Sequence, residues 1–190
     1  MSTLSLQNFL QKNTTLDEEE SAEVASAFKP IKVRRNEIIE REGNICGHFY
    51  FIHKGCLRLY EIDKKGNEIT AYFAFENSFI TAITSLITQK PSRDILIAHE
   101  PSELMVIDKV SFFNLTERYS PFKLFYNKMM EFAFIHAQMR IYSFLGMDGI
   151  DKLKWVLEHE PMLLTRISSK AVASYLGMTN STLSKLKAKL

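Results

Sequence analysis

Cysteine is scarce in this sequence: the 190 residues contain only Cys46 and Cys56. The two stand too far apart for a CxxC pair, and they are too few for an iron–sulfur cluster held by four thiolates. We expect both to be small buried residues. The five histidines show no clustered spacing, so each is interpreted as a structural or surface residue and no metal site is predicted.

Long apolar runs are missing as well. Stretches such as residues 132–135 fall far short of the roughly 20 residues that a membrane-spanning helix needs. Residues 1–15 lack the basic start and the continuous apolar core of a secretory signal. We therefore expect a cytoplasmic protein with no membrane contact.

Common enzyme signatures are also absent. The sequence has no GxGxxG, P-loop, HExxH or GxSxG motif, and no carboxylate pair at a useful spacing on one element. An enzyme is therefore not expected.

Acidic residues are missing from the end of the chain. Residues 162–190 hold five basic residues and no Asp or Glu. Residues 149–190 carry a net charge of +4, which leaves −2 for the rest of a chain whose total is +2. This asymmetry is typical of a segment that faces nucleic acid.

Turns containing glycine separate short β-rich segments in the first half of the chain. The segments are residues 37–39, 49–53, 56–60, 69–75, 95–98 and 103–107. A short helix is expected before them over residues 16–29, because Asp17 can cap it and Pro30 stops it. An extended turn and a second short helix are expected over residues 78–91. Many short antiparallel strands with glycine corners predict a compact roll or barrel.

A long helical pattern follows Asp108, with a break at Pro121 and continuation to about Leu145. Apolar residues and one histidine repeat in it at steps of three and four, which is typical of a seam that pairs with a second copy. The seam consists of Phe122, Phe125, Met129, Phe132, His136 and Met139. Other faces of this helix are apolar too, so we expect it to contact both the roll and a partner copy. A core helix of a monomer is the alternative.

The end of the chain carries the most specific pattern. Ser168 or Ser169 can cap a helix that Gly177 closes, because a helix often ends on a left-handed residue. Thr179 then caps a second helix, and the small Ala173 allows the two helices to cross closely. These features predict a helix-turn-helix.

The outer face of the second helix is polar and cationic, which suits a DNA major groove. The candidates for contact with base edges are Asn180, Ser181, Ser184 and Lys185. The candidates for phosphate are Lys170, Thr182, Lys187 and Lys189, and Thr179 completes the predicted DNA-binding set. An ordinary helical hairpin with a solvated basic face is the alternative.

A β-roll, a long helix and a terminal helix-turn-helix, in that order, resemble the cyclic-AMP receptor protein and FNR family of transcription regulators. Residues 171–185, Ala-Val-Ala-Ser-Tyr-Leu-Gly-Met-Thr-Asn-Ser-Thr-Leu-Ser-Lys, are similar to the recognition motif of that family. Residues 42–55 and 57–60 are similar to its effector domain, and the resemblance covers essentially the whole chain.

The resemblance implies an α+β fold with an N-terminal antiparallel β-roll of the cyclic-nucleotide-binding, jelly-roll type. Residues 1–110 would form the roll with its flanking helices, 111–146 the dimerisation helix and hinge, and 147–190 an all-α DNA-binding domain. It also implies a bacterial-type regulator that binds double-stranded DNA as a homodimer and has RNA polymerase as a further partner. Because the chain stops about where the recognition helix stops, a full β-wing is expected to be missing, and affinity to depend more on dimerisation and low salt.

Two positions depart from the cyclic-nucleotide binders of the family. The Gly-Glu pair that holds the ribose corresponds to Thr81-Ala82, and the Arg-hydroxyl pair that holds the phosphate corresponds to Ser92-Arg93. The acceptor for ribose hydroxyls is lost, and the displaced Arg93 is expected to point to the wrong face. We therefore expect a regulator that does not respond to cyclic AMP. No cofactor is certain, and the pocket beside these four residues would take an unknown small molecule or nothing.

The alternative function is a ligand-binding or protein-interaction module with the same roll and no DNA-binding role. Such a module would tolerate charge reversal at Lys185 and Lys187.

Overall fold

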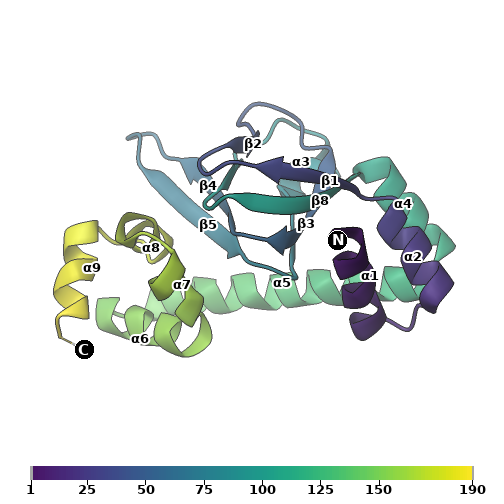
Figure 1. Cartoon of the computed structure of the whole chain (residues 1–190). Coiled ribbons are helices and arrows are strands. Elements are labelled where there is room, and N and C mark those ends of the chain that lie inside the picture. Colours follow the sequence, from purple (N-terminus) through teal and green to yellow (C-terminus); the bar gives the residue numbers. More distant parts are fainter. Residues whose placement is uncertain (1, 190) are drawn as a thin grey trace. The chain divides into compact units, whose positions relative to one another are not determined.

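The computed structural model describes residues 2–189. Contacts group Met1–Glu61 with Tyr72–Met130 in a first unit, and Ile62–Ala71 with Glu131–Leu190 in a second. The chain order of the elements can be followed in Figure 1. This grouping places a short hairpin segment with the C-terminal helices and divides the long helix between the units. The three-part division by sequence remains a prediction.

The roll consists of two four-stranded sheets, with strand orders β1-β8-β3-β6 and β2-β7-β4-β5. The strands are β1 (Lys29–Val33), β2 (Ile38–Glu40), β3 (His48–Lys54), β4 (Leu57–Ile62), β5 (Glu68–Ala74), β6 (Phe79–Ile80), β7 (Ile95–Ala98) and β8 (Ser102–Asp108). The pairing is antiparallel, with Tyr50 opposite Val106 at the centre of the first sheet. The predicted α+β fold with an antiparallel roll is therefore confirmed.

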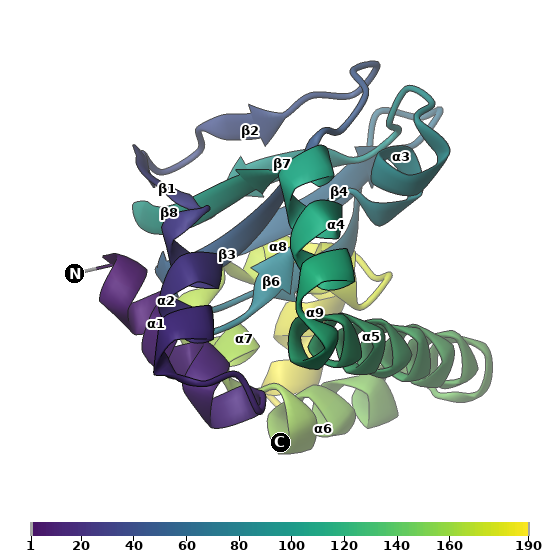
Figure 2. The same cartoon turned by 90° about the vertical axis from the view of Figure 1, so that its right-hand side faces the viewer.

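Four helices belong to the first unit, together with the start of a fifth. They are α1 (Ser2–Asn13), α2 (Glu18–Ser26), α3 (Ile83–Thr88) and α4 (Lys109–Arg118), followed by α5 (Ser120–Gly146). Asp17 caps α2 in a reciprocal capping box with Glu20, as its position predicts. Figure 2 shows α1 and α2 side by side, with α4 leading into α5. The predicted break in the long helix falls at Tyr119, and Pro121 occupies the first turn of α5.

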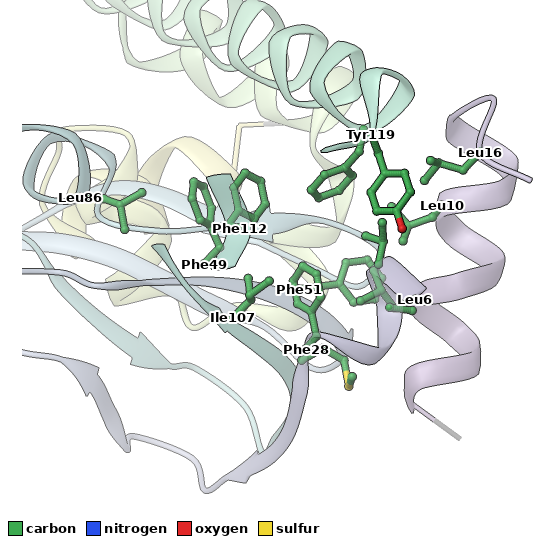
Figure 3. Packing of buried hydrophobic residues seen from close by; sticks show 14 of the residues in the cluster. Leu6, Leu10, Leu16, Phe28, Phe49, Phe51, Leu86, Ile107, Phe112 and Tyr119 are labelled. Atoms are coloured by element: carbon green, nitrogen blue, oxygen red, sulfur yellow. The ribbon is translucent and has the colours of Figure 1, made fainter. Parts of the chain in front are cut away.

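Strand β3 is buried on both faces. Its side chains alternate, so Phe49 and Phe51 join the core under the helices, whereas Tyr50 and Ile52 join the core between the sheets. Phe49 stacks on Phe112 of α4 with ring centroids 3.9 Å apart, as Figure 3 shows. The helices are thus fixed to the roll by aromatic packing.

The second unit contains the remaining helices of the described chain. They are α6 (Gly149–His159), α7 (Pro161–Arg166), α8 (Ser169–Tyr175) and α9 (Asn180–Lys187). The side chain of Asp148 caps α6 by accepting hydrogen bonds from the N–H groups of Ile150 and Asp151. Among the helices of residues 2–189, none combines the length and the apolar character needed to cross a bilayer.

Candidate nucleic-acid interface and effector position

The two predicted C-terminal helices are present with their predicted caps. Ser168 accepts a hydrogen bond from the Ala171 N–H at 3.4 Å and begins α8. Thr179 Oγ1 accepts one from the Thr182 N–H at 3.1 Å and begins α9. Between the helices Gly177 has φ +65°, a left-handed conformation that glycine adopts without strain.

The inner faces of α8 and α9 meet in a small core. Ala173 is 1 % exposed, and its small side chain allows the helices to approach closely; Leu183 of α9 is fully buried. Leu186, expected to face inward, is half-buried. Helix α9 packs against both α8 and α6, so these two helices together cover its apolar stripe.

The predicted DNA-binding side chains all lie on the exposed surface of these helices. Exposed residues are Lys170, Thr179, Asn180, Ser181, Thr182, Ser184, Lys185, Lys187 and Lys189. The hydroxyl of Thr179 is already engaged in the cap and lies within 2.9 Å of the Ser181 and Thr182 hydroxyls. The outward face of α9 is therefore polar and cationic, and it can donate and accept hydrogen bonds.

The predicted seam of α5 divides into two parts. Phe122 is fully buried in the core of the first unit, so its side chain is unavailable to a partner. Phe125 and Met129 are partly buried against the same core. By contrast Phe132 and Met139 are 65 % and 46 % exposed. The last seam residue, His136, pairs through Nε2 with Glu160 Oε1 at 2.9 Å.

Thr81 and Ala82 directly precede α3. Thr81 Oγ1 donates to the His48 carbonyl at 2.7 Å and lies 3.3 Å from Cys46 Sγ. Ala82 is fully buried. The Cys46 N–H donates to Ser85 Oγ, which in turn donates to the Lys90 carbonyl. The polar groups of this segment are thus hydrogen-bonded to one another.

Ser92 and Arg93 point in different directions. Ser92 is 6 % exposed, and its hydroxyl donates to the Asp94 carbonyl and accepts from the Asp94 N–H. The Arg93 side chain is 79 % exposed and pairs with Glu61 at 3.1 Å. The guanidinium therefore does not join the Ser92 hydroxyl in a shared anion site.

Residues 30–119 match the model of the family described as "Cyclic nucleotide-binding domain". The roll is therefore similar to domains of this family. The match ends at Tyr119, so residues 120–190 lie outside it.

A curated relative and two solved structures resemble this chain. The cAMP-dependent protein kinase regulatory subunit of Blastocladiella emersonii is 31% identical over 108 residues, which are 55% of this chain and 25% of the relative. The chain therefore spans about a quarter of the length of that relative. The structure of FixK2 from Bradyrhizobium japonicum has TM-score 0.73 at 18% identity and covers 86% of this chain and 84% of its own. The global regulator CLP of Xanthomonas campestris has TM-score 0.73 at 14% identity, covering 91% of each chain. The chain thus shares its fold with these two proteins.

Within the roll, the carboxylate of Glu40 contacts Cys46, whose thiol also contacts Thr81. Glu40 Oε1 accepts from the Tyr50 hydroxyl at 2.7 Å and from Cys46 Sγ at 3.6 Å. Burial is the main cause that raises the pKa of both the Tyr50 hydroxyl and the Cys46 thiol, and proximity to Glu40 adds to it. Sequence reasoning had not singled out Glu40, because its closeness to Cys46 depends on how β2 and β3 fold together.

Sequence reasoning also missed Arg140. It is the one formally charged residue between Glu131 and Asp148, and this isolation within an apolar stretch is the signal that marks it.

Among the described residues, no three His, Cys, Asp or Glu side chains gather in a way that could hold a metal ion.

Proposed function

We propose that this chain is a sequence-specific DNA-binding transcription regulator whose cyclic nucleotide-binding domain does not respond to cyclic AMP. The observation that carries the proposal is the exposed face of α9, with Asn180, Ser184 and Lys185 on a helix capped by Thr179 and backed by the buried Leu183. A helix held in this way presents amide, hydroxyl and ammonium groups to base edges, while further lysines reach phosphates. RNA polymerase is the further partner of a regulator of this kind.

A second copy of the chain is the partner proposed for α5. Beyond Met129 this helix exposes seven large apolar side chains, each at least 46 % exposed: Phe132, Phe134, Ile135, Met139, Ile141, Tyr142 and Leu145. Phe132 and Met139 of this set belong to the seam. The steps of three and four residues between successive seam positions suit pairing with an identical helix. A symmetric pair would carry two copies of α9 and read two half-sites about 10 bp apart, centre to centre.

Selection of DNA from a random pool by the purified protein tests the function. We expect a two-fold symmetric site whose affinity falls as salt rises, because lysines that contact phosphates release counterions. Charge reversal at Lys185 and Lys187 to Glu should abolish binding. Reversal of the exposed Lys12 and Lys29, outside the interface, is the matched control and should leave it intact.

Failure to enrich any sequence would contradict the proposal. So would unchanged binding after reversal at Lys185 and Lys187. Either result would favour the ligand-binding or protein-interaction module.

Calorimetric titration with cyclic AMP tests the effector domain. We expect no detectable binding, because Ala82 supplies no ribose acceptor and the exposed Arg93 side chain pairs with Glu61. A micromolar or tighter dissociation constant would show that this part of the proposal is wrong.

A further inference from the structure

Arg140 is a mostly buried arginine at the meeting point of three segments of the second unit. It lies on α5, and its Nη1 donates to the carbonyl of Ala71. Its Nη2 donates to the carbonyls of Thr70 at 2.7 Å and Tyr175 at 2.9 Å. The guanidinium carbon also lies 4.1 Å from the centre of the Tyr175 ring. One side chain thus connects α5 to the hairpin segment Ile62–Ala71 and to the end of α8.

A second connection runs parallel to the first. The Tyr175 hydroxyl donates to Glu160 Oε1 at 2.9 Å, and the same oxygen lies 2.9 Å from His136 Nε2. His136 and Arg140 are four residues apart, so they share one face of α5. That face therefore holds α8 at two points.

The hairpin segment also contacts α8 directly. Ser174 Oγ accepts from the Thr70 N–H at 3.0 Å and lies 2.9 Å from the Thr70 hydroxyl. It donates to the carbonyl of Glu68. Together with Arg140, these bonds leave α8 little freedom to turn against α5 and the hairpin.

The chemistry of this junction requires arginine. A planar guanidinium can donate to several carbonyls at once while its face stacks on an aromatic ring, whereas a lysine ammonium is a compact, strongly hydrated point charge. Burial lowers the pKa of Arg140, because the charged guanidinium loses part of its hydration there. This loss of hydration is offset only when the hydrogen bonds are made together.

We propose that Arg140 is a positioning residue that fixes the helix-turn-helix on the second half of α5. In a dimer paired through α5, it would then set the spacing between the two α9 helices. This inference rests on the proposed DNA-binding function. The two α9 surfaces are rigidly related only if each helix-turn-helix is rigidly related to α5.

Binding to operators with altered spacers tests the inference. The wild-type protein should prefer one half-site spacing and lose affinity sharply when one or two base pairs are added or removed. Arg140→Met should bind the preferred site about tenfold more weakly, since fewer molecules hold the competent arrangement. It should also lose the discrimination between spacers. Arg140→Lys should not rescue either property.

Two controls separate positioning from general damage. Lys128→Met removes one positive charge from an exposed position of the same helix and should bind like wild type. Trp155, the sole tryptophan, lies 6.1 Å from the His136 ring and should change its emission in Arg140→Met but not in Lys128→Met. If Arg140→Met does not fold, Ser174→Ala removes the hairpin contact alone and should relax the spacing preference in the same direction.

The outcomes distinguish this inference from the proposed function. A wild-type protein that selects no symmetric DNA site would contradict both the proposed function and this inference. A wild-type protein with a fixed spacing, together with an Arg140→Met variant that keeps the same fixed spacing, overturns the inference alone.

Discussion

Asp94 directly follows Ser92 and Arg93, two of the residues predicted to line the effector pocket. Burial, followed by the nearby Glu61 carboxylate, raises the pKa of Asp94, and Arg93 only partly counteracts this. The hydroxyl of Ser92, two residues earlier, hydrogen-bonds to the Asp94 backbone. The Ser92 hydroxyl is thus already hydrogen-bonded within its own segment.

Asp94→Asn should raise the free energy of unfolding at neutral pH. A carboxyl whose pKa is raised in the folded state loses stability as pH rises above its ordinary value of 3.8 and through the folded value. The amide does not ionise, so the difference between variant and wild type should vanish below that window. Urea denaturation at several pH values measures it. An equal or lower stability of the variant at neutral pH would contradict this reasoning.

Burial of individual residues could be predicted better than their partners. Cys46 and Cys56 are both buried free thiols, as expected from their scarcity. The contacts of Cys46 with Glu40 and Thr81 could not be foreseen, because they join residues 6 and 35 positions away. Likewise the pairing of Arg93 with Glu61 could not be foreseen, because Arg93 lies in the loop before β7 and Glu61 lies on β4.

Elements with strong local signals were predicted, and those without were missed. Asp17, Ser168 and Thr179 cap helices as their positions indicate. Strand β1 was missed because Pro30, which stops the preceding helix, lies inside it; β1 is an edge strand, where proline is tolerated. Helix α7 has only six residues, too few to show a period.

Gly177→Ala should lower the stability of the second unit by about 1–2 kcal/mol, because a β-carbon is strained at φ +65°. Urea denaturation followed by Trp155 fluorescence reports on that unit. Gly146→Ala is the matched control: no neighbouring atom lies within 4 Å of its added carbon, so stability should hold or rise. Equal effects of the two substitutions would show that the left-handed turn is not the cause.

At the scale of the whole molecule, the exposed apolar side chains of α5 are the feature that most requires a partner. The sequence predicts that faces of α5 other than the seam are apolar too, but it does not predict the division of the seam. The same spacing that pairs helices in a dimer also packs Phe122 against Phe112 of the same chain, with ring centroids 5.2 Å apart. Periodicity identifies a buried face and does not say which neighbour buries it.

Replacement of Phe132 and Met139 by Glu should convert the dimer to a monomer, because carboxylates on a symmetric surface face their own copies. Sedimentation velocity measures the state, and binding to the selected DNA should weaken in parallel. Leu4→Glu, a change at a side chain 59 % exposed on α1, is the control and should remain dimeric. A wild-type protein that is monomeric at micromolar concentration would contradict the proposed pairing.

The most direct measurement of the DNA-binding claim is affinity for the selected site as a function of salt concentration. For wild type, the logarithm of the association constant should fall linearly with the logarithm of salt concentration. Replacing Lys187 and Lys189 by Gln in both protomers should make that slope shallower by about 3 to 4 and leave the preferred sequence unchanged. A slope that is flat in the wild-type protein, or unaltered in the variant, would contradict the assignment of α9 to DNA.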